Sequence, residues 1–259
     1  MLIVVPTLGQ RVHFLEQTLA SLADQLPRPD VIVVAPAAAT RANEIAARLG
    51  ARTLVDPGGQ AAAINLGMSA AERSHEFVNW IGDDDLLEPG SIAATVRALD
   101  QRADAVVAYG ACRYVDRTGN QLWISRAGRW APRILAWGPD LIPQPGMLIR
   151  RVAWDEVQGL DEAMRFAFDL DLLLKLRAVG AFVDVGAVVS SFRWHPDSLT
   201  VSDRSRSLAE SRLARRRALS PGMRRLAWSW EGPVDLATRL AAAEVTRRAR
   251  RRQSQGGAI

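Results

Sequence analysis

Short runs of apolar, largely β-branched residues recur along the first 100 residues, and glycine, proline or aspartate follows most of them. Runs of this length and composition are typical of buried strands. They predict strands at 2–7 (LIVVPT), 30–36 (DVIVVAP), 52–56 (RTLVD) and 77–82 (FVNWIG).

Longer segments between these runs carry apolar residues at helical spacing. The clearest predicted helix spans 11–26, where one face carries Leu15, Leu19, Leu22 and Leu26. The segments 39–50 and 58–72 are further predicted helices, and Gly50 closes the first of them. Because strands alternate with helices, this half predicts βαβ crossovers, a mostly parallel sheet and a ligand site beyond the carboxyl ends of the strands.

The second half of the chain has a less regular pattern. Ser91 is the predicted N-cap of a helix over 91–101. Four prolines within 128–146 predict an irregular loop. The other predicted elements are a β-hairpin (105–116 and 121–126), a strand with a short helix (146–164), an amphipathic helix (168–180) and a late strand (182–195).

The positive charge of the 259-residue chain is concentrated at one end. Residues 205–259 carry 13 arginines and 4 acidic residues, a net charge of +9, whereas the whole chain has a net charge of +5. In this tail arginines alternate with Leu, Met and Trp, which is typical either of an interfacial helix on an anionic membrane or of a solvated face. No nucleic-acid motif accompanies the charge, and residues 247–259 are predicted to be disordered.

Other features of the composition indicate the compartment. The single cysteine, Cys112, excludes an internal disulfide framework. The first residues, MLIVVPTLGQ, lack a basic start and a cleavage site, and no apolar run reaches the ~18 residues of a spanning helix. These observations predict a cytoplasmic protein, and contact of the tail with the inner face of the cell membrane stays an open alternative.

Two acidic motifs carry the candidate chemistry. Asp83, Asp84 and Asp85 follow the predicted strand at 77–82, where they are either ligands for Mg²⁺ or Mn²⁺ or caps in a solvated turn. Asp169 and Asp171 stand at the start of a very apolar helix. One of them is either a general base near a reacting hydroxyl or a group that stabilises the helix N-terminus.

Taken in order, the motifs of this chain resemble those of family-2 glycosyltransferases, which have the GT-A nucleotide-sugar fold. The resemblance covers residues 1–204 and rests on VVPT, VIVV, GGQAAAINLGM, NWIGDDDLLEPGS, GLDEAMRFAFDLDLLLKLRAVG and FRWHPDSLT. It implies an α/β fold with a Rossmann-like, mostly parallel sheet flanked by helices. It divides the chain into a nucleotide-sugar half (1–100), an acceptor half (101–204) and an Arg-rich helical tail (205–259).

The resemblance also implies roles for individual residues. Asp169 matches the catalytic base, and Asp84 is the best match to the position that contacts Mg²⁺ or Mn²⁺, with Asp83, Asp85 and His195 as further metal candidates. The candidates for nucleotide-sugar binding are Pro6, Thr7, Asp56, Gln60, Asn65 and Asp83. The candidates for the acceptor pocket and its loops are Trp130, Trp137, Gln144, Asp171 and Arg193.

The chain departs from the family pattern at several positions. Gly82 stands where an acid or asparagine is common, and Phe168 replaces the usual glutamate before the base. Ala35 and Pro36 replace the acid that reads the nucleotide base, and Ile64 replaces a basic residue. These departures leave uridine, thymidine and guanosine donors open.

The resemblance therefore predicts an inverting, metal-dependent enzyme that transfers a hexosyl or deoxyhexosyl group. Its expected partners are a nucleotide-diphosphate sugar and a glycan or lipid-linked acceptor in bacterial cell-surface polysaccharide synthesis, and nucleic acid is not expected. One alternative is a sugar-phosphate nucleotidyltransferase, although PTLGQRVHF lacks the Gly-rich loop that such enzymes usually have after the first strand. The other is a catalytically inactive relative that binds nucleotide sugars.

Overall fold

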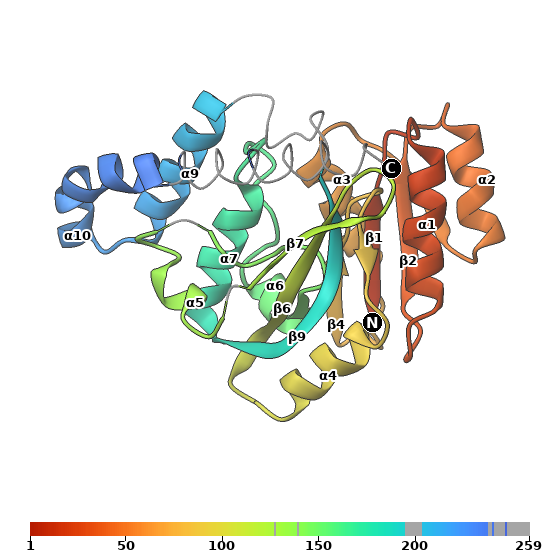
Figure 1. Cartoon of the computed structure of the whole chain (residues 1–259), viewed down its shortest axis with the longest axis horizontal. Coiled ribbons are helices and arrows are strands. Elements are labelled where there is room, and N and C mark those ends of the chain that lie inside the picture. The colour runs from red at the N-terminus through yellow and green to blue at the C-terminus, as the bar shows by residue number, and fades with distance from the viewer. Residues whose placement is uncertain (127, 139, 195–203, 238–239, 241–246, 248–259) are drawn as a thin grey trace.

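A computed structural model describes residues 1–126, 128–138, 140–194, 204–237, 240 and 247. One twisted sheet runs through the molecule, and helices cover both of its faces (Figure 1). The α/β fold predicted from the sequence is confirmed. The predicted disorder of 247–259 lies almost entirely outside the described residues.

The first half of the chain has the predicted alternation of strands and helices. Its elements are β1 (Leu2–Pro6), α1 (Val12–Ala23), β2 (Asp30–Ala35), α2 (Thr40–Arg48), β3 (Arg52–Val55), α3 (Gln60–Ser69) and β4 (Phe77–Trp80). Strands β3, β2, β1 and β4 are neighbours in that order, and every pair among them is parallel. The chain leaves β1 toward one side and returns to its other side at β4, which creates the crevice where α/β sheets bind ligands.

The second half completes the sheet with mixed pairing. Its elements are β5 (Leu86–Leu87), α4 (Ser91–Asp100), β6 (Ala105–Val115), β7 (Gln121–Ser125), α5 (Ala131–Ile134), β8 (Leu148–Arg150), α6 (Arg151–Glu156), α7 (Phe168–Val179), β9 (Ala181–Arg193), α9 (Arg204–Ala218) and α10 (Pro221–Leu226). The sheet order continues from β4 through β8, β6 and β9 to β5. The predicted hairpin is confirmed, because β6 and β7 pair antiparallel.

Three details differ from the sequence prediction. Gly90, not Ser91, is the N-cap of α4, and its φ of 76° lies in the left-handed region that favours glycine. Strand β5 was not expected because two residues are too few to form a recognisable pattern. The Pro-rich loop contains the short helix α5, with Pro132 in its first turn, where a missing N–H costs nothing.

Alternating residues of β1 join two separate hydrophobic clusters. Ile3 and Val5 pack in the same cluster as Leu19 of α1. Leu2 and Val4 pack in the other cluster, which includes α3 and much of α7. Because strand side chains alternate between faces, this single strand ties both helical layers to the sheet.

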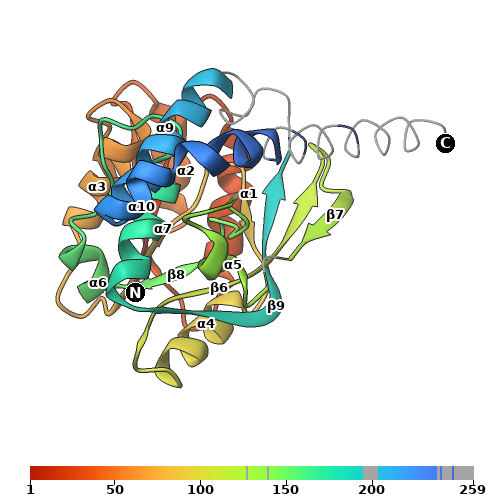
Figure 2. The ribbon, with the colours of Figure 1, turned by 90° about the vertical axis from the view of Figure 1, so that its left-hand side faces the viewer.

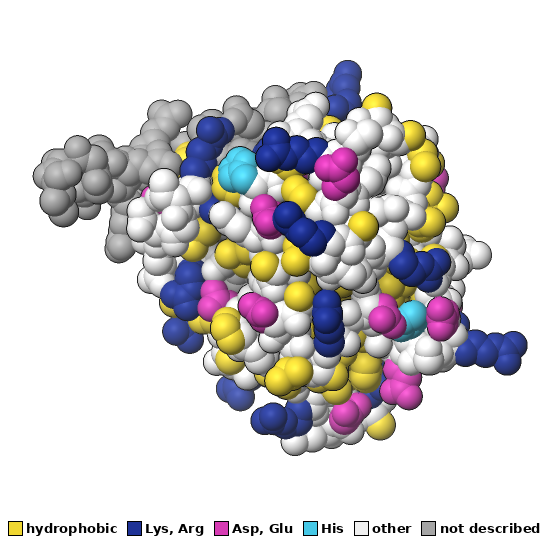
Figure 3. Space-filling view, turned by 90° about the vertical axis from the view of Figure 1, so that its right-hand side faces the viewer, with side chains coloured by type: hydrophobic (Ala, Val, Ile, Leu, Met, Phe, Trp, Pro, Cys, Tyr) yellow, Lys and Arg dark blue, Asp and Glu magenta, His cyan; other side chains and the backbone are white. Residues whose placement is uncertain are grey.

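The C-terminal helices lie on the far side of the molecule from α1 and α2, and α9 packs against α7 (Figures 1 and 2). None of the helices among the described residues is long and apolar enough to cross a membrane. On the face that carries α1 and α2, basic and acidic side chains are interspersed (Figure 3).

Candidate active site

A large cleft opens at the carboxyl ends of β1 and β4, with a volume of about 1590 Å³. Residues from both halves of the chain line it. Those that matter for the chemistry are Thr7, Arg11, Gln60, Asp83, Asp84, Asp140, Gln144 and Asp169. The two acidic motifs predicted from the sequence therefore share one cleft, although 84 residues separate Asp85 from Asp169.

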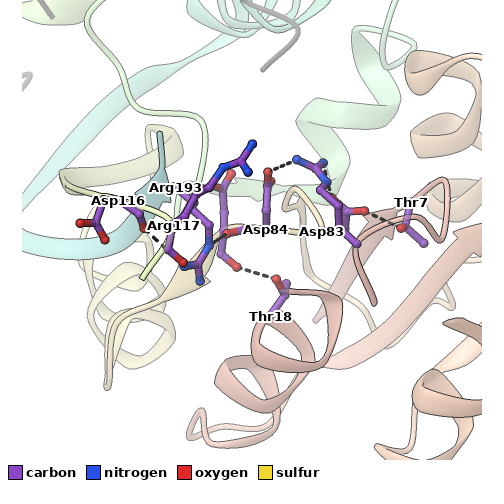
Figure 4. Close-up of polar contacts among 9 residues, drawn as sticks. Thr7, Thr18, Asp83, Asp84, Asp116, Arg117 and Arg193 are labelled. Atoms are coloured by element: carbon purple, nitrogen blue, oxygen red, sulfur yellow. Dashed lines mark hydrogen bonds and ion pairs between the residues drawn. The ribbon is translucent and has the colours of Figure 1, made fainter. Parts of the chain in front are cut away.

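An arginine that the sequence analysis did not single out binds the first two aspartates of the triplet. Arg11 donates from Nη2 to Asp83 Oδ1 at 2.6 Å and from Nη1 to Asp84 Oδ2. Thr7 donates from Oγ1 to Asp83 Oδ2 at 2.5 Å (Figure 4). Burial raises the pKa of Asp83, while Thr7 and Arg11 oppose that rise. The guanidinium of Arg11, in the loop after β1, therefore offsets the repulsion between the first two carboxylates of the triplet.

Asp85 also lines the cleft, but it is 4% exposed and, unlike its two neighbours, is bonded to the backbone behind the turn. Its Oδ1 accepts the backbone N–H of Arg193 at 3.1 Å, and its carbonyl accepts the Thr18 hydroxyl at 2.8 Å. Burial, followed by the charge of Asp84, raises its pKa well above the usual range. A Cβ on Gly82 would lie 3.1 Å from carboxylate oxygens of Asp84 and Asp85. Glycine at this position therefore leaves room for the turn that carries the triplet.

Arg193 braces this turn from behind and does not line the cleft. Its Nε donates to the carbonyl of Asp84 at 3.1 Å, its Nη2 donates to Gln17 Oε1 at 2.7 Å, and its guanidinium lies 4.2 Å from the ring centre of Phe14. The side chain is 2% exposed. Arg193 therefore supports the Asp83–Asp85 turn, and it is not part of the cleft lining in which an acceptor-pocket candidate was expected.

The Asp83–Asp84 pair fits a divalent cation. Both residues offer hard carboxylate oxygens, and both already bind the positive charge of Arg11. Mg²⁺ is commonly held by one or two carboxylates together with substrate phosphates. Over the described ranges, no three His, Cys, Asp or Glu side chains form a group that could enclose a metal. His195 lies outside the described residues.

Asp169 lies in the first turn of α7 and faces the same cleft. Its Oδ1 accepts the backbone N–H of Leu170 at 2.8 Å, and burial raises its pKa. A second carboxylate, Asp140, lines the cleft and was not expected from the sequence. Burial, together with the charge of Asp169, raises the pKa of Asp140 to about 7. Two semi-buried carboxylates with raised pKa values are typical of a site that moves protons.

Most of the nucleotide-side candidates also line the cleft, namely Pro6, Thr7, Asp56 and Gln60. Asp56 Oδ1 accepts the N–H of Gly58 at 2.9 Å and so shapes the glycine turn that opens α3. Gly58 and Gly59 both have positive φ, which lets this turn approach a ligand closely. Asn65 is placed elsewhere: its amide exchanges hydrogen bonds with the backbone of Leu160.

The acceptor-side candidates separate in the same way. Gln144 lines the cleft and donates to the carbonyl of Trp80 at 2.7 Å. Asp171 is 2% exposed and forms an ion pair with Lys175 at 2.7 Å, away from the cleft. Trp130 and Trp137 lie outside the cleft lining, and the ring of Trp137 packs 5.0 Å from that of Trp230.

Solved structures with the same fold were found at low sequence identity. Staphylococcus aureus TarS, residues 1–349 in complex with UDP-GlcNAc, is 15% identical with a TM-score of 0.64, and the match covers 86% of this chain and 68% of that 1–349 chain. The mannosyltransferase PcManGT from Pyrobaculum calidifontis, in complex with GDP-Man and Mn²⁺, is 17% identical with a TM-score of 0.58, covering 99% of this chain and 79% of the other. No curated protein sequence matches the chain.

The sequence profile described as "Glycosyl transferase family 2" matches residues 2–154, which is more than half of the chain. The matched region contains β1, the Asp83–Asp85 turn and Gln144, and the fold continues through Asp169. The chain belongs to glycosyl transferase family 2.

Proposed function

We propose that this protein is an inverting glycosyltransferase that moves a sugar from a nucleotide-diphosphate sugar to an acceptor hydroxyl. The observation that carries the proposal is the placement of two separate acidic sites, Asp83–Asp84 and Asp169–Asp140, in one cleft. The first site suits the diphosphate side of a donor, and the second suits the hydroxyl of an acceptor. In this proposal residues 1–100 form the nucleotide-sugar half and residues 101–204 the acceptor half.

The chemistry follows from the charges that develop during transfer. Asp169 takes the proton of the acceptor hydroxyl while the hydroxyl oxygen attacks the anomeric carbon. The bond from that carbon to the diphosphate breaks, and the nucleoside diphosphate leaves with the bonding electrons. Asp84 and Asp83 would hold a divalent cation, which would supply positive charge at the leaving group. A single displacement inverts the anomeric carbon, so no covalent enzyme intermediate is needed.

Two further features support the choice of donor class. The structures of TarS and PcManGT hold UDP-GlcNAc and GDP-Man respectively, and the Gly58–Gly59 turn leaves backbone close to the nucleotide side of the cleft. We infer from the family resemblance that the acceptor is a glycan or lipid-linked sugar of a bacterial cell surface; the volume of the cleft leaves room for an acceptor beside a nucleotide sugar.

Hydrolysis of a donor panel tests this function. We expect the protein with Mn²⁺ or Mg²⁺ to release nucleoside diphosphate slowly from one donor among UDP-, dTDP- and GDP-sugars, because water can replace the acceptor hydroxyl. Release should fall strongly with EDTA. Formation of a nucleotide sugar from nucleoside triphosphate and sugar phosphate would identify a nucleotidyltransferase instead. Tight donor binding with no turnover would identify an inactive relative.

We also propose that the C-terminal segment touches an anionic membrane surface and so brings the enzyme to a lipid-linked acceptor. Around α10, exposed apolar side chains stand beside exposed arginines. This surface, called the α10 patch below, consists of Arg224, Arg225, Leu226, Trp228 (74% exposed) and Leu236. An exposed tryptophan with arginines and leucines is the composition of an interfacial segment.

Removing two charges from the α10 patch is expected to weaken membrane binding. Each arginine near an anionic surface contributes about 1 kcal/mol, so Arg224→Ala with Arg225→Ala should reduce binding to phosphatidylserine vesicles about 30-fold at low salt. Co-sedimentation measures this change. The control is Arg41→Ala with Arg52→Ala, which removes the same charge from exposed positions by α2, on the other side of the molecule. Equal binding by both double variants would contradict the membrane proposal.

A further inference from the structure

Helix α9 contributes a carboxylate to the start of the helix that carries Asp169. Glu210 Oε2 accepts three consecutive backbone N–H groups, from Phe166 at 2.7 Å, Ala167 at 3.0 Å and Arg165 at 3.1 Å. More than 40 residues separate Glu210 from these donors. A carboxylate that accepts several backbone N–H groups makes strong, charge-assisted hydrogen bonds.

The N-cap residue of α7 makes no side-chain hydrogen bond. Ala167 holds this position and its side chain has no oxygen, while within the first turn Asp169 Oδ1 accepts the N–H of Leu170. The negative charge of Glu210 also lies at the positive end of the helix dipole. The contact therefore fixes, from a distant part of the sequence, the three residues that lead into α7, the last of which is the N-cap Ala167.

The same face of α9 also contacts residues 161–171 outside the three amides that Glu210 binds. Glu210, Ala214 and Arg217 recur at i, i+4 and i+7, so they share one side of the helix, and Ala214 is 1% exposed against its neighbours. Arg217 donates to Asp161 Oδ2 at 2.6 Å and lies 3.7 Å from Asp171 Oδ1. Helix α9 thus contacts this segment at Asp161, at residues 165–167 and at Asp171, and Asp169 lies between the last two contacts.

We propose that Glu210 is a positioning residue for Asp169: it fixes residues 165–167, which lead into α7, so that the Asp169 carboxylate is held at the acceptor side of the cleft. This inference rests on the proposed function, because it gives Asp169 the role of base. It also assigns α9 to the catalytic domain. The membrane contact proposed above then concerns the α10 patch and not α9. A displacement of about 1 Å in a reacting group can cost about 10²-fold in rate, so a contact that fixes the backbone up to two residues before the base can affect catalysis.

The test compares Glu210→Ala and Glu210→Gln with Arg216→Ala. Arg216 is on the same helix and makes a two-bonded ion pair with Glu231, at 2.5 and 2.6 Å, without touching residues 161–171. Each variant is measured for kcat and donor affinity with the donor that the wild type hydrolyses in Mn²⁺. Thermal melting reports the stability of each fold. Hydrogen exchange follows the amides of residues 165–167, and carboxyl ¹³C NMR follows the titration of Asp169.

We expect Glu210→Ala to lower kcat about 10- to 100-fold with donor affinity unchanged, and to speed exchange of the three amides about tenfold or more. The pKa of Asp169 should fall toward its ordinary value, because a loosened turn admits water. Glu210→Gln, which keeps one carbonyl acceptor, should lie between Glu210→Ala and the wild type. Arg216→Ala should melt earlier with kcat and the Asp169 titration unchanged.

Several outcomes would overturn the inference. It fails if Glu210→Ala and Arg216→Ala lose kcat in proportion to their loss of melting temperature, since Glu210 would then be only a stabilising contact. It also fails if the amides of 165–167 or the Asp169 titration do not change. Absence of turnover by the wild type with every donor would instead reject the proposed function, and the exchange and titration measurements would still decide whether Glu210 positions Asp169.

Discussion

Replacing Asp169 with asparagine is expected to slow sugar transfer by about 10²–10⁴-fold, the usual cost of a lost general base, while donor affinity hardly changes. Asparagine keeps the shape of the side chain and a carbonyl oxygen that can accept the N–H of Leu170, so the turn itself should survive. Steady-state kinetics for transfer or donor hydrolysis, paired with calorimetry of donor binding, measure the two effects separately.

Two neighbouring acids serve as controls for this substitution. Asp171→Asn weakens the buried contact with Lys175 and the approach of Arg217, so it should destabilise the fold; its loss of kcat should be far smaller than that of Asp169→Asn, because Asp171 does not face the cleft. Asp140→Asn leaves Asp169 in place and should retain most of the rate. A normal rate in Asp169→Asn, together with a large loss in Asp140→Asn, would move the base to Asp140.

The pH dependence of the rate gives an independent check. A base works only when it is deprotonated, and burial raises the pKa of Asp169. Activity should therefore fall as the pH drops through this raised pKa, at a higher pH than for an ordinary aspartate. Because Asp140 titrates near pH 7 beside it, the acid limb is expected to be broad and to sharpen in Asp140→Asn.

The sequence predicted the elements whose apolar residues follow a regular spacing, and the site residues that belong to recognisable motifs. The strands β1 to β4 and their helices follow from apolar periodicity, and Asp84 and Asp169 follow from motifs whose order resembles a known family. The place of Asp84 at the ligand edge could be expected, since the carboxyl ends of parallel strands meet at one edge of a sheet. Asp169 lies in the first turn of a helix, so its presence in the same cleft was implied only by the resemblance.

The contacts that complete the site could not be predicted in this way. Arg11 reaches Asp84 across 73 positions, and Glu210 reaches Phe166 across 44. Neither contact leaves a periodic trace in the sequence, and an arginine in an Arg-rich chain is not conspicuous. Asp140 lies in a Pro-rich loop without periodicity, where only the folded structure shows which side chains turn inward.

Arg11 balances the negative charges of two neighbouring aspartates, because its guanidinium forms ion pairs with the carboxylates of both Asp83 and Asp84. The same oxygens suit Mg²⁺ or Mn²⁺. A cation that arrives with a diphosphate would take over part of the charge balance that Arg11 provides in this structure. Asp84 is the better position to test, because Asp83 is also bound by Thr7 and a change there would disturb β1.

Replacing Asp84 with alanine is expected to abolish the metal-dependent part of donor binding and to leave the fold intact. Loss of a metal contact to the diphosphate is worth several kcal/mol, so the affinity for UDP or GDP in Mn²⁺ should fall about 10²-fold or more, to the value measured in EDTA. Calorimetry with each nucleoside diphosphate, with and without Mn²⁺, measures this loss.

The matched control is Asp104→Ala, which removes an exposed carboxylate that pairs locally with Arg102. This variant should bind nucleoside diphosphate like the wild type. If Asp84→Ala keeps the full Mn²⁺-dependent affinity, then Asp84 does not hold the metal, and the triplet serves to anchor Arg11 and Arg193 instead.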